Sequence, residues 1–337
     1  MIERLLGLMF RGTGGVEGED YVSLVCQAVS NLVEEVHPEF PATMGGLPVG
    51  TAGGIDDPSM QRGVSTAFED AKRIFLARQA LTPNVGVVIG GYSAGAVAAA
   101  LFRQWLLENY ADNYCCSFSI GDPTRPSKGA FFAGAPAPGH GISTWRYGDV
   151  ADWRHCWLSQ KGDMYTSVPE GDTGLILGDF YDIVSRLQLS DPLGTFGAIL
   201  EKLPDILTHL GILGEGRHET SAPLSNLLDL ITKALFQSPK QQQDLLGGLL
   251  SGNPNAWASI GMASPKPLIL HSLTGLLDGE PDYLAAGIDA AIVAAKFAAA
   301  GTAPHISYEH AEVWPGQTYL GLAVQHVRDW ASRFNQA

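Results

Sequence analysis

The chain has 337 residues, with 35 acidic and 21 basic side chains and a formal net charge of -14 at pH 7. This acidic balance, with no cluster of lysine and arginine, argues against nucleic acid and anionic membrane surfaces as partners. The length exceeds that of a usual single domain, so we expect one α/β domain with a large insertion, or two domains.

The first half of the chain alternates strand-like and helix-like segments. Short apolar runs, typical of buried strands, occur at residues 4–10, 85–90, 129–134 and 153–158. Apolar residues at helical spacing, or alanine-rich runs, occur at residues 19–37, 63–80 and 96–110. This alternation predicts an α/β fold in which a central parallel sheet carries helices on both faces.

The composition changes from about residue 174. Leucine-rich amphipathic runs, separated by proline and glycine, lie at residues 196–210, 224–236 and 241–250 and predict a helical insertion. A final amphipathic helix is expected at 317–334, packed on the sheet. The predicted domains are an α/β domain formed by residues 1–182 and 301–337, and a helical insertion formed by residues 183–300.

The sequence GYSAG at residues 91–95 stands between the strand-like run 85–90 and the helical run 96–110. G-x-S-x-G between a strand and a helix is typical of a nucleophile elbow, a sharp turn that exposes the serine hydroxyl. Its glycines leave room for the neighbouring strand and helix. The pattern alone also arises by chance, so its context carries the prediction that Ser93 is a nucleophile. A glycine-rich turn with an idle serine is the alternative.

A serine nucleophile needs a base and a carboxylate that orients the base. In α/β-hydrolases these follow in the chain order Ser, Asp or Glu, His. The acid is expected on a loop just after a strand, and Asp163 follows the run 153–158 in that way. A helix cap or a solvated carboxylate is the alternative for this residue. The competing acids are Asp149, Asp152, Asp172 and Asp179.

The base is expected in a loop before the last helix. His305 and His310 are the two histidines so placed. Pro304 fixes the backbone ahead of His305, which favours that residue over His310. The other histidines lie in predicted helices or on other loops, where surface or core positions are expected.

An oxyanion needs two backbone N–H donors. One is expected from Ala94, the residue after the nucleophile, and the other from a loop after an early strand. The sequence RGTGG at residues 11–15 follows the first predicted strand, and Thr13 can add its hydroxyl. A plain glycine-rich turn and a phosphate-binding loop are the alternatives, but the G-x-G-x-x-G spacing and a following Lys-Ser/Thr pair are absent.

The cysteines are expected to be buried and unpaired, because they show neither zinc nor disulfide spacing. They are Cys26, Cys115, Cys116 and Cys156. The first ten residues lack the features of a secretory signal. The longest apolar stretch, residues 86–102, falls short of a membrane span. We therefore expect synthesis in a cytoplasm and no integral membrane segment.

These motifs together resemble the cutinase superfamily and, within it, the lysin B proteins of mycobacteriophages. The segments that carry the resemblance are RGT at 11–13, GYSAG at 91–95, GDMY at 162–165, GAP at 134–136 and APHISY at 303–308. The resemblance covers roughly residues 4–182 and 303–334. It implies an α/β-hydrolase fold of the cutinase-like type, with Ser93 as nucleophile, Asp163 as acid, His305 as base, and Thr13 with Ala94 at the oxyanion hole.

Two features depart from this family pattern. Secreted cutinases have a disulfide that brackets the acid loop, whereas Cys156 has no evident partner near Asp163, which favours the phage branch. The stretch between Asp163 and His305 is also far longer than a compact cutinase needs. The insertion at 183–300 accounts for most of it, as a lid, as a platform for long acyl chains, or as packing alone.

The resemblance implies a serine esterase that cleaves the ester between mycolic acids and arabinogalactan, through an acyl-enzyme and without metal or cofactor. Such an enzyme is made in the host cytoplasm and acts at the envelope with other phage lysis proteins. A general cutinase-like lipase or esterase of an actinobacterium is one alternative. A non-catalytic α/β-hydrolase fold used as a binding module is another.

Overall fold

The structure is a computed structural model that describes residues 4–47, 49–127, 137–146, 152–188, 190–191, 201–202, 205 and 303–334. The chain divides into two compact units. The first comprises Met1–Ala42, Met60–Val168 and Gly301–Ala337, and the second comprises Thr43–Ser59 and Pro169–Ala300. The predicted strand at 129–134 and most of the predicted insertion at 183–300 lie outside the described residues, so the predicted domain boundaries stay a prediction.

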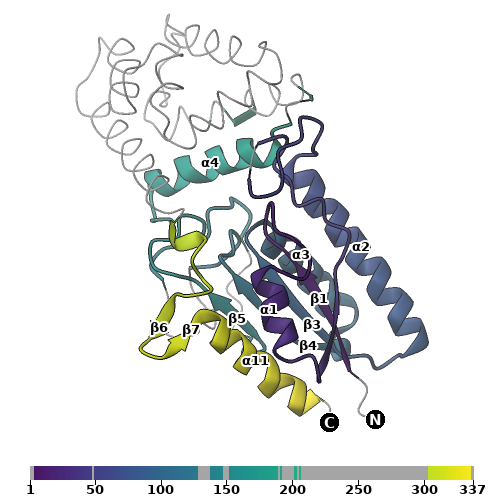
Figure 1. The fold of residues 1–337 in the computed structure, drawn as a ribbon. Helices are drawn as coiled ribbons and strands as arrows, with labels where there is room; N and C mark the ends of the chain where they lie inside the picture. Colours follow the sequence, from purple (N-terminus) through teal and green to yellow (C-terminus); the bar gives the residue numbers. More distant parts are fainter. Residues whose placement is uncertain are drawn as a thin grey trace, which may run out of the picture. The chain divides into compact units, whose positions relative to one another are not determined.

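A five-stranded sheet forms the centre of the first unit, and every neighbouring pair of its strands is parallel (Figure 1). Its strands, in spatial order, are β2 (Val33–Val36), β1 (Leu5–Phe10), β3 (Val87–Tyr92), β4 (Tyr114–Ile120) and β5 (His155–Leu158). Strands β1, β4 and β5 are buried along their whole length. Burial on both faces is expected where helices cover a parallel sheet on both sides.

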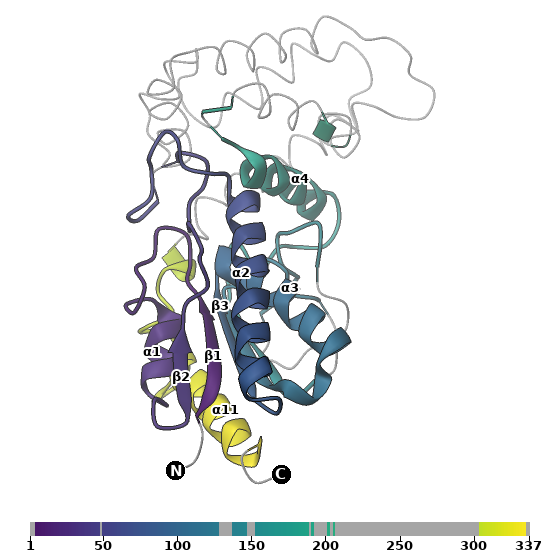
Figure 2. The ribbon, with the colours of Figure 1, turned by 90° about the vertical axis from the view of Figure 1, so that its right-hand side faces the viewer.

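Helices cover both faces of this sheet. Helices α1 (Tyr21–Gln27) and α11 (Tyr319–Phe334) lie on one face, and α2 (Met60–Leu81) and α3 (Ala94–Asn109) lie on the other (Figures 1 and 2). The predicted pattern is visible in α11, where the buried residues Ala323, Val327 and Ala331 recur every four positions. The three layers form an α/β-hydrolase fold, as the sequence predicts.

Two segments differ from the sequence-based prediction. Residues 19–37 do not form one helix: α1 ends at Gln27, and Val33–Val36 forms β2, with Val33 opposite Leu5 of β1. The prediction was wrong because the valines are spaced as in a helix, yet β-branched residues gain more from pairing beside β1. Strand β4 was missed, since serines at 117 and 119 interrupt its apolar run.

The remaining elements include a 3-10 helix, η1 (Ala111–Asn113), just before β4. A hairpin of β6 (Glu312–Trp314) and β7 (Gln317–Thr318) precedes α11, so the predicted final helix begins at Tyr319 rather than at residue 317. Helix α4 (Asp172–Arg186) belongs to the second unit. All four cysteines are buried, as predicted. Among the residues that the structure describes, none of the helices combines the length and apolarity that a bilayer crossing requires.

Two buried histidines make polar contacts inside the first unit. The ring nitrogens of His155 on β5 lie 2.6 and 3.3 Å from the hydroxyls of Ser117 and Ser119. Nε2 of His326 on α11 lies 3.0 Å from the carbonyl oxygens of Ser117 and Arg154, so it donates to both. Burial lowers the pKa of both imidazoles below the usual value of 6.5, and far below it for His155. Both side chains are therefore neutral in the folded protein near neutral pH.

We expect the free energy of unfolding to fall as the pH drops below 6.5. Below that value the unfolded chain protonates His155 and His326 while the folded chain does not, so the unfolded state binds more protons. Each histidine contributes up to about 1.4 kcal/mol per pH unit to this loss. Urea unfolding at a series of pH values on both sides of 6.5 measures it.

The variant His326→Gln should weaken this pH dependence, because an amide N–H₂ can donate to the same two carbonyls without titrating. The matched control is His310→Gln, whose side chain is 84% exposed. It should leave the slope unchanged. An unaltered slope in His326→Gln would contradict the assignment.

Candidate active site

Ser93 stands on a sharp turn between β3 and α3. Its backbone has φ 53° and ψ -126°, a region that a residue with a side chain rarely adopts. Such a conformation costs about 1–3 kcal/mol and persists only where the surroundings impose it. Here the N–H of Ser93 donates to the carbonyl of Ile120 on the next strand, at 3.0 Å. The turn therefore has the geometry of the nucleophile elbow that the sequence predicts.

The two glycines of the turn are required by close approach. A Cβ at Gly91 would lie 2.6 Å from Cα of Ala96 in α3. A Cβ at Gly95 would collide with the carbonyl oxygens of Phe10 and Arg11 at the end of β1. Helix α3 can thus pack directly on both strands only because these positions lack side chains.

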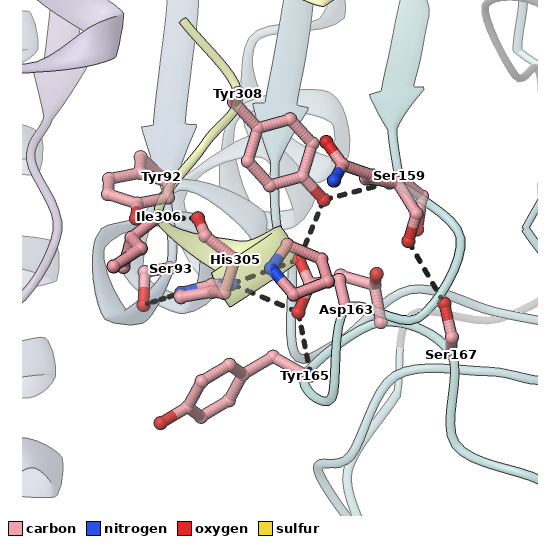
Figure 3. A network of polar contacts seen from close by, with 12 residues as sticks. Tyr92, Ser93, Ser159, Asp163, Tyr165, Ser167, His305, Ile306 and Tyr308 are labelled. Carbon is pink, nitrogen blue, oxygen red and sulfur yellow. Dashed lines mark hydrogen bonds and ion pairs between the residues drawn. The ribbon is translucent and has the colours of Figure 1, made fainter. Parts of the chain in front are cut away.

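His305 links the serine to a carboxylate (Figure 3). Its Nε2 lies 2.8 Å from Oγ of Ser93, and its Nδ1 lies 3.0 Å from both carboxylate oxygens of Asp163. Because a carboxylate only accepts hydrogen bonds, we assign the imidazole proton to Nδ1, which leaves Nε2 as an acceptor for the serine hydroxyl. The histidine is buried, with 5% of its surface exposed.

The carboxylate of Asp163 is fully buried and receives further donors. The N–H of Tyr165 donates to Oδ1 at 2.8 Å, and the hydroxyl of Tyr308 donates to Oδ2 at 2.6 Å. That hydroxyl in turn accepts from the N–H of Gln160 at 2.9 Å. Burial, and then the neighbouring Asp163, raise the pKa of Tyr308 well above its ordinary value, so the phenol stays a donor.

The buried guanidinium of Arg125 stabilises the loop that follows Asp163. Arg125 donates to the carbonyl oxygens of Thr166, Pro138 and Gly139 at 2.7, 3.0 and 2.8 Å. Burial lowers its pKa to about 10, against the opposing effect of Tyr308 and nearby carboxylates including Asp163, so it remains charged at neutral pH. Its bonds join the loop after Asp163 to residues 138–139.

Two further tyrosines contact the imidazole of His305. The ring of Tyr92, the residue before the serine, stacks on it at 5.2 Å and 24°, and its hydroxyl donates to the carbonyl of His305 at 2.9 Å. The ring of Tyr165 lies 4.2 Å away on a tilt of 46°. Tyr92 and Tyr308 were missed as site residues by the sequence analysis. Both lie within motifs that it used, but nothing in those motifs states which groups their hydroxyls reach.

The competing candidates lie elsewhere. His310 is exposed and 3.8 Å from Glu309. Asp152 pairs with Arg154 at 3.0 Å. Asp179 belongs to the second unit, where it lies 3.8 Å from Lys202, while Asp149 and the side chain of Asp172 lie outside the described residues. The structure thus brings together Ser93, Asp163 and His305, and places His310 apart from them.

The loop after β1 lies against the elbow. A Cβ at Gly12 would be 2.5 Å from the ring of Tyr92 and 3.4 Å from Cβ of Ser93. Thr13 Oγ1 is buried and has no hydrogen-bond partner among the described residues. Ala94 is the first residue of α3, and an N–H in the first turn of a helix has no partner within that helix. The oxyanion role of Thr13 and Ala94 stays a prediction.

This arrangement can perform proton transfer from a hydroxyl through an imidazole, with a fixed carboxylate behind it. Among the described residues, groups of three or more His, Cys, Asp and Glu side chains that could hold a metal ion do not occur.

No protein-family model matches this chain, and no curated protein matches it either. Among solved structures it is similar to lysin B from Mycobacteriophage D29, with 14% identity, 97% of this chain and 100% of that chain covered, and a TM-score of 0.41. It is similar to the catalytic core domain of acetyl xylan esterase from Trichoderma reesei, with 15% identity, coverages of 54% and 94%, and a TM-score of 0.40. It is also similar to a cutinase-like protein from Cryptococcus sp., with 17% identity, coverages of 55% and 96%, and a TM-score of 0.35.

Gly121, directly after β4, leaves the space that the imidazole occupies. It has φ 58°, and a Cβ there would lie 2.7 Å from Cε1 and 2.9 Å from Nδ1 of His305. We therefore expect Gly121→Ala to displace the imidazole. The downfield proton resonance of the hydrogen bond between His305 and Asp163, measured by NMR, should disappear or shift.

The matched control is Gly316→Ala. Gly316 also has a positive φ, 82°, but a Cβ there would meet nothing within 4 Å. Both variants carry a similar backbone penalty of about 1 kcal/mol. Gly316→Ala should keep the resonance. Equal behaviour of the two variants would mean that backbone strain, rather than contact with His305, explains the result.

Proposed function

We propose that this protein is a serine esterase that hydrolyses carboxylic esters of lipids through a covalent acyl-enzyme. In this proposal Ser93 is the nucleophile, His305 the general base and acid, and Asp163 the carboxylate that orients the imidazole. The observation that carries the proposal is the continuous hydrogen-bonded chain from Ser93 Oγ through both ring nitrogens of His305 to Asp163.

In the first step His305 Nε2 takes the hydroxyl proton while Oγ of Ser93 attacks the ester carbonyl carbon. A bond forms from Oγ to that carbon, and the carbonyl π electrons move to its oxygen. Asp163 keeps the imidazole in the required tautomer and stabilises the imidazolium that forms. The 2.8 Å separation of Nε2 and Oγ is within the range that proton transfer needs.

The negative oxygen is bound by the N–H of Ala94 and by Thr13, through its hydroxyl or its backbone N–H. The buried Thr13 hydroxyl, without a partner among the described residues, supports this role because its donor is unused and the residue before it, Gly12, lies against the elbow. Donors held in place before the reaction stabilise the developing charge without having to reorganise.

In the second step the tetrahedral intermediate collapses. The bond between the acyl carbon and the leaving alcohol breaks, and His305 returns its proton to the alcohol oxygen. Water then attacks the acyl-enzyme with the same base, the ester to Ser93 breaks, and the carboxylic acid is released. No step calls for a metal or a cofactor.

For the substrate we propose the ester that joins mycolic acids to arabinogalactan, cleaved during phage lysis. The support is the resemblance of the motifs at 11–13, 91–95, 162–165 and 303–308 to lysin B proteins. An apolar substrate also suits Ile306, which directly follows the base and is 62% exposed. Synthesis in the host cytoplasm and action at the envelope with other lysis proteins belong to the same proposal.

Ser93→Ala should abolish ester hydrolysis while the protein stays folded. The expected loss in turnover of a p-nitrophenyl ester is about 10³-fold or more, because the attacking oxygen is removed. Wild-type protein should be labelled by a fluorophosphonate probe and the variant should not. Unlabelled, inactive wild type would point instead to a binding module.

His305→Ala should lose nearly all activity, whereas His310→Ala should lose less than about tenfold. The reason is geometric, since Nε2 of His305 lies 2.8 Å from Ser93 Oγ and the side chain of His310 is 84% exposed. Turnover of a short p-nitrophenyl ester measures both. An inactive His310→Ala beside an active His305→Ala would make His310 the base.

The substrate proposal is tested on purified mycolyl-arabinogalactan-peptidoglycan. Wild-type protein should release free mycolic acids, and Ser93→Ala should release none. Hydrolysis of short esters without release of mycolic acids would favour a general cutinase-like esterase.

A further inference from the structure

Two adjacent residues at the start of α1 reach different parts of the site. Asp20 is the N-cap of the helix, and Tyr21 is its first residue. The side chain of Asp20 contacts the loop after β1, and the side chain of Tyr21 contacts the segment that carries His305. Both segments border Ser93, yet they are nearly 300 residues apart in the chain.

Asp20 fixes the loop after β1. Its Oδ2 accepts from the N–H of Gly12 at 2.9 Å, and its Oδ1 accepts from the N–H of Val22 at 3.3 Å. The carboxylate is buried, with 8% of the residue exposed. Gly12 lies directly against the elbow, and the next residue is Thr13. The bond made by Asp20 therefore anchors the residue that precedes Thr13.

Tyr21 fixes the histidine segment. Its hydroxyl donates to the carbonyl of Ile306 at 2.8 Å, one residue after the carbonyl of His305 that accepts from Tyr92 at 2.9 Å. The rings of Tyr21 and Tyr92 meet edge to face at 4.7 Å and 60°. The phenol of Tyr21, from α1, and the phenol of Tyr92, from β3, are thus in contact with each other and hydrogen-bond to two consecutive carbonyl groups.

We propose that Asp20 and Tyr21 are positioning residues. They hold the loop after β1, residues 11–15, and the segment that carries His305, residues 303–308, in fixed positions relative to each other on either side of Ser93. The inference rests on the proposed esterase function and extends it. Because the two residues are adjacent and joined by a helix start, a shift of α1 would displace both halves of the site together.

The N-cap role of Asp20 must be separated from its bond to Gly12. Serine is as good an N-cap as aspartate, but its shorter side chain cannot also reach the N–H of Gly12. Asp20→Ser therefore keeps the helix start and releases the loop. Tyr21→Phe keeps the ring contact with Tyr92 and releases the carbonyl of Ile306. The control is Ser23→Ala in the same helix, whose buried hydroxyl has no partner among the described residues.

The three variants are compared by kcat and KM on a short p-nitrophenyl ester, by melting temperature, and by the NMR resonance of the His305–Asp163 proton. We expect Asp20→Ser to lower kcat about tenfold or more with KM within about twofold, and to leave the resonance in place, because the loss concerns the oxyanion. We expect Tyr21→Phe to shift or broaden the resonance and to lower kcat about tenfold. Ser23→Ala should change none of these.

Wild-type kcat and an unchanged resonance in both test variants would overturn the proposal. So would matching losses in Ser23→Ala, since these would mean a general effect of α1. If Asp20→Ser does not fold, Asp20→Thr serves in its place. Threonine also caps a helix through a hydroxyl and is likewise too short to reach the N–H of Gly12 as well, so the same loss of kcat supports the proposal and wild-type kcat overturns it.

The resonance separates this inference from the proposed function. Wild-type protein without esterase activity would refute the esterase, while a resonance shift in Tyr21→Phe alone would still support the positioning of His305. Active wild type with active variants would refute only the positioning role.

Discussion

The buried carboxylate of Asp163 is the group on which the site depends. It has no exposed surface, and a buried carboxylate is tolerated only where its oxygens are hydrogen-bonded. Its donors are the N–H of Tyr165, the hydroxyl of Tyr308 and the imidazole of His305. Arg125 braces the loop that carries it. Removing any of these donors would leave the buried carboxylate with an unsatisfied oxygen, which costs free energy. This cost keeps the loop that carries Asp163 next to the segment that carries His305.

The order of the strands explains why these groups meet. In a parallel sheet the carboxyl ends of all strands open at one edge. Strand β3 carries Ser93 there, and its two neighbours are β1 and β4. The loop after β1 supplies Gly12 and Thr13, and Gly121 after β4 leaves room for the imidazole. Asp163 follows β5, one strand further on. Ser93 is therefore flanked by the loop after β1 on one side and by Asp163 and His305 on the other.

Local sequence patterns predicted the parts of the fold and site whose causes are local. The elbow is encoded in five consecutive residues, α2 and α11 in regular apolar spacing, and α3 in an alanine-rich run. The prediction of secondary structure failed where a contact between residues far apart in the chain determines the conformation. Within residues 19–37, pairing beside β1 makes a strand around Val33, and in β4 the polar Ser117 and Ser119 are buried because a histidine on the next strand contacts them. Tyr308 reaches the acid across 145 positions, which no local pattern specifies.

The long stretch of chain between Asp163 and His305 adds little to the entropic cost of bringing these two residues together. Asp163 and His305 are 142 positions apart, but the entropy of closing a loop grows only with the logarithm of its length, by about 0.6 kcal/mol per doubling. Three doublings beyond a short connection thus cost about 2 kcal/mol. The hydroxyls of Tyr21, Tyr92 and Tyr308 each make a hydrogen bond worth about 0.5–1.5 kcal/mol, and more for the bond to the carboxylate. These three bonds are enough to offset that cost. The histidine segment is therefore positioned by the groups that it contacts at the site.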